Sequence, residues 1–315
     1  MIIARSLEEV RHEKPSVVTV GTFDGVHLAH REIIREVVNR TNVREGRSVV
    51  VTFDPHPKEV VTSRQGEVKL LSTIDERIAL LEEFNIDLLF IIEFTYAFSR
   101  LTSREFYRDY LVDHVGVSEV VVGYDHMFGR DRKSGIEELV KIGQEFDFSV
   151  FALHPYTVDG EPVSSTRIRR ALQAGNVERA RTLLGYPYAI RGRVVAGDGR
   201  GKTMGYPTAN IVPESPKKAI PGRGVYVVGV SIGKEQLFGM LNIGVRPTVS
   251  TTGQELIEVH IFDLSRELTG AEVTIRFLHK LRDERKFASL NELIEQLARD
   301  KEESLRYVGG RVKQQ

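Results

Sequence analysis

The first half of the chain alternates short, continuous apolar runs with longer segments whose apolar residues recur at helical spacing. The apolar runs are rich in β-branched residues and predict buried strands; they cover 17–20, 48–53, 87–92, 119–124 and 148–154. The helical patterns cover residues from 28 onward, 72–84, 102–115 and 136–146. Such alternation is typical of a parallel sheet covered on both faces. We therefore expect a Rossmann-like α/β domain, with Ser72 and Asp75 capping the helix at 72–84.

The second half has a different pattern. Its apolar runs are short, β-branched and separated by turn residues; they cover 190–196, 225–232, 236–243, 257–262 and 272–277. This spacing predicts a small antiparallel β-barrel. An amphipathic helix at 290–307 follows, and its expected buried residues are Leu293, Ile294, Leu297 and Leu305.

A break in the pattern places the domain boundary. The segment after Ser164 is helical in pattern, and Gly185-Tyr186-Pro187 ends it. A length of 315 residues suits two domains. We therefore expect domains at 1–184 and 185–315.

Composition narrows the class of protein. Lys+Arg and Asp+Glu number 44 each, so the net charge of zero argues against a broad basic surface for nucleic acid. The absence of cysteine excludes disulfides, thiolate zinc sites and cysteine nucleophiles. The N-terminus lacks the apolar segment of a signal peptide, and no apolar run is long enough to span a bilayer. We expect a cytoplasmic protein without membrane attachment.

Ligands of parallel α/β sheets bind beyond the carboxyl ends of the strands. In the first half these ends lead into Gly21–His30, Asp54–Pro57, Tyr124–Arg132 and the segment after Pro155. His27 and His30 lie three residues apart, where a strand hands over to a helix. A helix N-terminus offers free N–H groups to phosphate. The two histidines therefore indicate either a phosphate site or a turn with two solvated side chains.

Two further segments suit phosphate. A helix is expected to start at Ser165 or Thr166, whose hydroxyls lie at its N-terminus. The loop 196–210 is rich in glycine, which allows an anion-binding nest of backbone N–H groups. Its first part resembles a Walker A loop, but Gly205 and Pro207 prevent the helix that must follow. We exclude a P-loop fold and keep the phosphate-binding interpretation.

Polar residues near this loop suggest a reaction centre. Thr208 and Asn210 point the same way in an extended segment, which suits either Mg²⁺ shared with phosphate oxygens or a simple turn. Glu258 has the same parity as Leu256 and His260 in its strand and is expected to face inward. An inward carboxylate needs a role or a partner. A general base and an ion pair with an arginine both remain open.

The sequence resembles the bacterial bifunctional riboflavin kinase/FAD synthetase family over essentially its whole length. The motifs that carry the resemblance are GTFDGVHLAH (21–30), TFDPHP (52–57), GYDHMFGRDRKSG (123–135), SSTRIR (164–169), GDGRGKTMGYPTANI (197–211), NIGVRPT (242–248), EVHIFD (258–263) and LRDERKF (281–287). Each is weak alone, and their shared order makes the resemblance specific.

The resemblance implies a two-step enzyme. The barrel would phosphorylate the ribityl 5′-hydroxyl of riboflavin with ATP, giving FMN. The N-terminal domain, with a nucleotidyltransferase fold, would transfer AMP from a second ATP to FMN, giving FAD and pyrophosphate. Mg²⁺ is the implied cofactor; riboflavin, FMN and ATP are the implied partners, and a homo-oligomer stays open.

The resemblance also implies residue roles. Catalytic roles fall on Glu258, His27, His30 and Arg167. ATP binding falls on Gly21, Phe23, Asp24, His27, His30, Ser164, Ser165, Thr166, Arg169, Gly197, Gly199, Gly201, Lys202, Thr208 and Asn210. Flavin binding falls on Asp54, His56, Asp125, Phe128, Arg132, Arg282 and Phe287. Thr208 and Asn210 are the implied Mg²⁺ ligands.

Two departures from the family pattern concern the N-terminal site. Ala29 stands where the family has glycine between its two histidines, and His126-Met127 stand where an aromatic usually follows the aspartate. One alternative is therefore a riboflavin kinase with a weak or inactive adenylyltransferase domain. A remote alternative is a nucleotidyltransferase-like protein that binds RNA, which the neutral charge disfavours.

Overall fold

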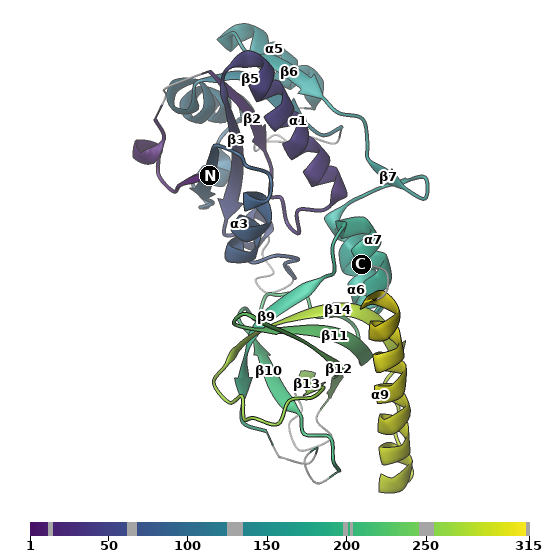
Figure 1. Ribbon diagram of the computed structural model, residues 1–315. Coiled ribbons are helices and arrows are strands. Elements are labelled where there is room, and N and C mark those ends of the chain that lie inside the picture. Colours follow the sequence, from purple (N-terminus) through teal and green to yellow (C-terminus); the bar gives the residue numbers. More distant parts are fainter. Residues whose placement is uncertain are drawn as a thin grey trace. The chain divides into compact units, whose positions relative to one another are not determined.

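The computed structural model describes residues 1–11, 15–61, 68–124, 135–197, 201, 204–245 and 255–312 (Figure 1). By packing, the chain divides into two compact units, Met1–Ser165 and Thr166–Gln315. This division falls earlier than the predicted boundary at 184/185, because α7 (Val177–Leu184) packs on a strand of the barrel. Within the described ranges, no helix combines the length and the hydropathy needed to cross a membrane.

The first unit contains the predicted parallel sheet. Its strands are β1 (Ile2–Ala4), β2 (Ser16–Val20), β3 (Arg47–Asp54), β4 (Leu88–Glu93), β5 (Val117–Val122) and β6 (Ser149–Ala152). They pair in parallel in the order β1-β4-β3-β2-β5-β6. The sequence did not reveal β1, because this edge strand is only three residues long and leaves Ile2 and Ile3 exposed.

Helices cover both faces of this sheet (Figure 1). They are α1 (Leu28–Arg44), α2 (Pro57–Val61), α3 (Ile74–Glu82), α4 (Ser103–Phe106) with its π-helical continuation η3 (Tyr107–Val115), and α5 (Ile136–Phe146). Short 3₁₀ turns are η1 (Leu7–Glu9) and η2 (Phe98–Arg100), and β7 (Thr157–Val158) pairs with β8 (Glu161–Pro162). Val50 packs with residues of α1 and α3, whereas Val49 and Val51 pack with η3 and α5. Both faces of β3 are therefore buried, which explains its continuous apolar sequence.

The cap of α3 differs from the prediction. Thr73 and Glu76 form the capping box, and Ser72 lies one residue before it. The Ser72 hydroxyl is used elsewhere, because it accepts a hydrogen bond from the N–H of Gly25.

The strand order places the ligand site of the first unit. From β2 the chain moves outward through β3 and β4 on one side, and then returns to β5 and β6 on the other. The order therefore reverses between β2 and β5, and ligands of open α/β sheets bind at such a switch point. The residues that follow β2 are Gly21–His27, the turn that the sequence singles out.

The second unit is the predicted antiparallel barrel with a C-terminal helix. Its strands are β9 (Ala189–Val195), β10 (Ala209–Pro213), β11 (Gly224–Ile232), β12 (Glu235–Val245), β13 (Glu255–Ile261) and β14 (Glu272–Arg282). They close in the order β10-β13-β12-β11-β14-β9. The sequence did not predict β10, because its apolar part is short and ends at Pro213.

Among the described residues, the helices that accompany the barrel are α6 (Ser165–Gln173), α7 and α9 (Leu290–Val312). α7 packs on β14, and α9 packs on β12 and β14. α6 and α7 are separate helices because Gly175, at φ +73°, interrupts the expected single helix. Of the residues predicted for the buried face of α9, Leu293, Ile294 and Leu297 are partly buried, and the prediction is wrong for Leu305. Leu305 is 45% exposed, whereas Asp300 and Ser304 are buried. The helix buries polar groups here because Asp300 pairs with Arg282, as described below.

Candidate active sites

A buried aspartate fixes the turn after β2. The Asp24 carboxylate is fully buried and accepts hydrogen bonds from the backbone N–H groups of Leu71 and Ser72, at 2.9 Å each. Its own backbone carbonyl accepts a bond from the hydroxyl of Ser165, the first residue of α6. Asp24 therefore holds together two of the segments expected to bind phosphate. Its side chain supports the turn from inside.

His27 and His30 lie against each other at the start of α1. His27 is the N-cap residue, and its Nδ1 accepts from the N–H of His30 at 3.4 Å. The two rings stack with centroids 3.5 Å apart, and the buried ring of Phe23 packs edge-on against His30. Phe23 therefore supports the His30 ring from below, and its side chain does not line the surface of the site. Gly21 lies directly beside Phe23, where a Cβ would come within 3.2 Å of the ring.

His30 carries an unsatisfied ring nitrogen. Although the residue is partly exposed, its Nδ1 is buried and has no hydrogen-bond partner within the described part of the chain. Burial lowers the pKa of His30 well below its ordinary value, and the charges of His27 and Arg77 lower it further. The ring is therefore neutral at neutral pH. A bound anion would raise the pKa of His30, because a nearby negative charge favours the protonated ring.

Arg77 is a buried cation that the sequence analysis missed. It lies on α3, is 2% exposed, and donates from Nη1 to the Thr52 hydroxyl at 3.0 Å and to the Phe53 carbonyl at 3.1 Å. Burial lowers its pKa, whereas the carboxylates of Asp24 and Asp54 raise it. The only sequence signal was an arginine among the apolar positions of a helical segment. Its charge helps to make this site suitable for an anion.

Of the other residues predicted for this site, the structure describes some, such as Asp54 and His56, and others lie outside the described ranges. Burial raises the pKa of Asp54 at the end of β3, against the opposing charge of Arg77. His56 is buried and its Nδ1 accepts from the N–H of Lys58, so it caps α2. Asp125, Phe128 and Arg132, together with His126 and Met127, lie outside the described residues. Ser164 belongs to the first unit, and Thr166, Arg167 and Arg169 lie in the part of α6 that belongs to the second.

The buried histidine predicts a pH dependence of stability. The ordinary histidine pKa is 6.5, and the pKa of His30 in the folded protein is lower. Below pH 6.5 the unfolded chain therefore binds a proton that the folded chain does not. The contribution of the neutral His30 ring to the free energy of unfolding is fully present above pH 6.5. It is lost as the pH falls from 6.5 toward the pKa of His30 in the folded protein, by up to about 1.4 kcal/mol per pH unit.

Urea unfolding of the wild type and of His30→Gln between pH 5 and 7.5, followed by circular dichroism, measures this contribution. The difference in unfolding free energy between the two proteins should change with pH below 6.5 and stay constant above it. A difference that is independent of pH throughout would contradict the buried, neutral state of His30.

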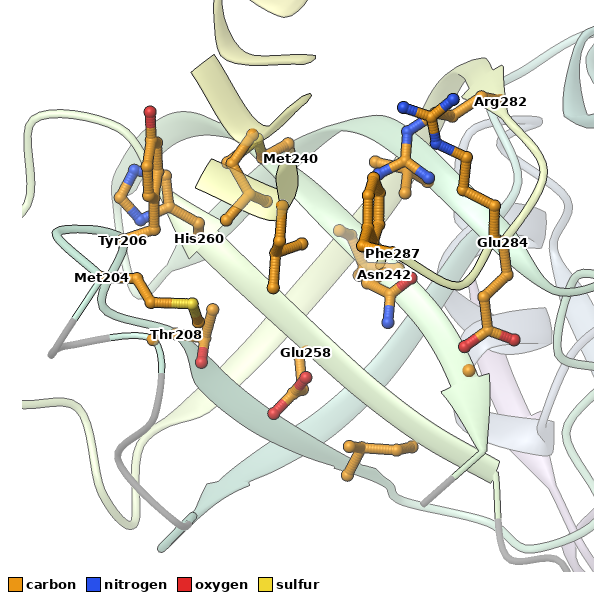
Figure 2. Close-up of a pocket in the computed structure, with 18 of the residues that line it drawn as sticks. Met204, Tyr206, Thr208, Met240, Asn242, Glu258, His260, Arg282, Glu284 and Phe287 are labelled. Carbon is orange, nitrogen blue, oxygen red and sulfur yellow. The ribbon is translucent and has the colours of Figure 1, made fainter. Parts of the chain in front are cut away.

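The second site is a cavity of about 350 Å³ in the barrel (Figure 2). Its lining comes from the glycine-rich segment, the strands and the start of α9. The lining residues are Gly201, Met204, Tyr206, Thr208, Val225, Met240, Leu241, Asn242, Gly244, Val245, Leu256, Glu258, His260, Arg282, Glu284, Arg285, Phe287, Leu293 and Leu297. Figure 2 shows Met204, Tyr206 and Thr208 on one side of Glu258, and Glu284 and Phe287 on the other.

Glu258 lies at the centre of a row of polar residues. In the barrel register it pairs with Asn210 of β10 on one side and with Asn242 of β12 on the other. Leu256, Glu258 and His260 all line the cavity, as the alternation in the sequence predicts. The carboxylate therefore faces a cavity large enough for substrate, flanked by two side-chain amides.

Two glycines of the glycine-rich loop pack closely, Gly197 on Asn210 of this row and Gly201 on the segment before β10. A Cβ on Gly197 would come within 1.8 Å of the Asn210 amide nitrogen, and a Cβ on Gly201 within 2.3 Å of the Tyr206 carbonyl oxygen. Glycine is thus the residue that fits at both positions. Residues 204–208 contain no helix and β10 follows, which agrees with the exclusion of a P-loop fold. Gly199 and Lys202 lie outside the described residues.

Comparison with known proteins identifies both halves. A family model for FAD synthetase matches residues 9–167, and one for riboflavin kinase matches residues 184–308. The chain is 38% identical to the bifunctional riboflavin kinase/FMN adenylyltransferase of Escherichia coli K12 over 285 residues, or 90% of each chain. The Bacillus subtilis protein of the same name is 34% identical, with 93% of this chain and 92% of that one covered. The chain belongs to this family.

A solved structure from Streptococcus pneumoniae, described as a macrolide-efflux protein, is also similar. It is 34% identical with a TM-score of 0.87 and covers 96% of this chain and 97% of its own. This likeness concerns the fold, and the efflux description stays with that protein. The assignment of this chain as a bifunctional riboflavin kinase and FMN adenylyltransferase rests on the two domain models and on the relatives of that name.

The riboflavin kinase domain contains an ion pair that joins its last strand to α9. The Arg282 guanidinium, at the end of β14, donates from Nε and Nη2 to the nearly buried carboxylate of Asp300, at 2.8–3.1 Å. Gln296 donates to the same carboxylate at 2.7 Å. Arg282 and Arg285 both lie near the ring of Phe287, at 5.6 and 4.8 Å from its centroid. Arg282 thus fixes the end of β14, and the segment that leads to Phe287, to α9.

Asp300→Asn is expected to loosen this segment. The substitution keeps the size of the side chain but removes the charge that Arg282 pairs with, at a cost of about 1.5–3 kcal/mol. We expect a higher KM for riboflavin, by about 3–10-fold at the cost of roughly one kcal/mol of binding, with a smaller change in the KM for ATP. Steady-state kinetics of FMN formation and urea unfolding measure both. An unchanged riboflavin KM in a destabilised variant would limit Asp300 to a structural role.

Proposed function

We propose that the chain makes FAD from riboflavin in two steps, each in its own unit. The barrel transfers the γ-phosphoryl group of ATP to riboflavin, and the first unit transfers AMP from a second ATP to FMN with release of pyrophosphate. The observation that carries the proposal is Glu258 in the wall of the barrel cavity, paired in the strand register with Asn210 and Asn242, beside the closely packed Gly197 and Gly201. We also propose that the protein is cytoplasmic and that its partners are the small molecules riboflavin, FMN and ATP, as expected from the sequence.

In the kinase step Glu258 is the general base. Its carboxylate takes the proton of the ribityl 5′-hydroxyl as that oxygen attacks the γ-phosphorus, and ADP leaves. The backbone N–H groups of the glycine-rich loop bind the phosphates, and close packing of Gly197 on Asn210 and of Gly201 on Tyr206 supports a fixed loop conformation. The flavin lies on the other side of Glu258, near Arg282 and Phe287, which Figure 2 shows away from Thr208.

The residues proposed for Mg²⁺ suit that ion. Thr208 lines the cavity, and the buried Asn210 lies in the cradle that Gly197 leaves open. Two neutral oxygen donors fit an ion that takes most of its ligands from water and substrate phosphates. No cluster of three acidic or histidine ligands occurs among the residues that the structure describes, so an all-protein cage is not offered there. When bound, Mg²⁺ neutralises charge on the transferring phosphate oxygens.

In the adenylyl-transfer step His27 and His30 contact the phosphates of ATP. A phosphate oxygen of FMN attacks the α-phosphorus, and pyrophosphate leaves. The stacked rings at the start of α1 and the unsatisfied Nδ1 of His30 support this role, because such groups bind and stabilise an anion. Arg167 is the further catalytic residue proposed here. Asp125, Phe128 and Arg132 are the proposed flavin contacts outside the described residues.

One incubation tests both steps. Purified protein is mixed with riboflavin, ATP and Mg²⁺, and the flavins are separated by chromatography. FAD as the end product supports the proposal. FMN that accumulates and does not react when supplied directly with ATP would refute the adenylyltransferase step and would favour the kinase-only alternative, in which Ala29 weakens the N-terminal site. Riboflavin that stays unphosphorylated would refute the kinase step.

A further inference from the structure

His260 lies in the wall of the barrel cavity but has no role in the proposed reaction. It is on β13, two residues after Glu258, and is 7% exposed. Its Nδ1 lies 2.8 Å from the backbone carbonyl oxygen of Pro207. A carbonyl oxygen only accepts hydrogen bonds, so Nδ1 carries the proton and donates.

This hydrogen bond continues the attachment of β10 to β13 beyond the sheet. The register pairs Asn210 with Glu258 and Ala209 with Val259. The next residue toward the glycine-rich loop is Thr208, followed by Pro207, which has no N–H to donate. The hydrogen bond from His260 therefore holds the chain just before β10 begins.

Aromatic neighbours fix the orientation of the His260 ring. Tyr206 packs edge-on with centroids 5.4 Å apart, and Phe262 packs on it at 5.8 Å. Figure 2 shows the rings of Tyr206 and His260 side by side, on the same side of Glu258 as Thr208. Burial lowers the pKa of His260, so the ring is kept neutral with its proton on Nδ1. A neutral ring with a fixed orientation can hold the Pro207 carbonyl in one position.

We propose that His260 is a positioning residue of the kinase site: by holding the Pro207 carbonyl it sets the position of the Thr208 hydroxyl relative to Glu258. Both Glu258 and His260 belong to β13, so one strand carries the base and also the residue that holds the segment before its neighbour, β10. The inference rests on the proposed kinase function of this cavity. It adds that His260 acts through Thr208 and contacts neither substrate directly.

Two nearly isosteric substitutions separate the hydrogen bond from the packing. The amide nitrogen of His260→Asn occupies the branch where Nδ1 stood and can donate to Pro207, whereas His260→Leu cannot. A misplacement of about 1 Å can reduce a rate by up to about 100-fold. We expect His260→Leu to lower kcat for FMN formation about 10-fold or more and to raise the KM for ATP more than that for riboflavin. His260→Asn should stay within about 3-fold of the wild type because its bond is retained.

A double-mutant cycle tests whether the effect passes through Thr208. If it does, His260→Leu should add little to the loss caused by Thr208→Val, since the hydroxyl that it positions is already gone. Urea unfolding followed by circular dichroism, measured for every variant, is the control for folding of the barrel, and conversion of FMN to FAD is the control for the first unit.

The inference would be overturned if the Asn and Leu variants were equally impaired, or if His260→Leu and Thr208→Val were additive. A failure of the proposed kinase function itself would give different results. In that case the wild type would form no FMN, or Glu258→Gln would retain full kinase activity, whatever residue 260 is.

Discussion

Glu258→Gln should lower the rate of FMN formation about 10²–10⁴-fold, the range that general-base catalysis supplies, while conversion of FMN to FAD persists. Glutamine keeps the size of the side chain and its place between Asn210 and Asn242, but it cannot take a proton. The KM values for ATP and riboflavin should change little, because the substitution removes an interaction made in the transition state. Steady-state assays of both reactions on the same preparation measure these quantities.

Glu284 supplies a matched control in the same cavity. It lines the cavity as Glu258 does, but Figure 2 shows it on the side of Phe287, away from Thr208. We expect Glu284→Gln to lower kcat only a few-fold, because mutation of a binding-site carboxylate without a role in proton transfer removes roughly 1 kcal/mol. Equal losses in the two variants would show that the charge of the cavity matters, and that Glu258 is not the base.

The hydrophobic pattern was enough to predict both folds. Strands with continuous apolar sequence, such as 48–53, and strands with β-branched runs in the second half lie where the pattern places them. The two strands that it missed are short and have little apolar sequence of their own. β1 pairs on one side only, at the sheet edge, and β10 is held by pairing with β9 and β13 rather than by a pattern of its own.

Local features drew attention to some of the predicted site residues, namely histidines at a helix start, glycines in a loop and a carboxylate in an alternating strand. The roles of others, such as Arg167 and Phe287, were implied only by the resemblance to the family. The residues that the sequence could not reveal act through partners far along the chain. Arg77 bonds to Thr52, Asp300 to Arg282, and His260 to Pro207. Each pair forms only when the fold brings separate elements together. Such contacts have no spacing rule in the sequence.

The surroundings also changed what some predicted residues do. Asp24 and Phe23 belong to the predicted ATP-binding motif, yet both side chains are buried. Asp24 holds the turn, and Phe23 supports His30. In physical terms the motif contains residues that would meet ATP and residues that hold those in place, and only the structure distinguishes them.

His30→Ala should have the opposite effect to Glu258→Gln. Loss of one preorganised donor to a developing anionic charge costs about 10²–10³ in rate, so FAD formation from FMN should fall by that factor while FMN formation stays within experimental error of the wild type. His154→Ala is the matched control, because this histidine also belongs to the first unit and is exposed. It should leave both activities unchanged.

A double variant of His27 and His30 tests whether the two rings act on the same phosphate group. The His27 ring stacks on that of His30 at 3.5 Å, so each ring restricts where the other lies. If the two rings act on one phosphate group as a unit, the double variant should lose little more activity than either single variant, because groups that act together are not additive. Additive losses would mean that the rings serve different phosphates. If His30→Ala and Glu258→Gln each abolished both reactions in folded protein, the assignment of one reaction to each unit would be wrong.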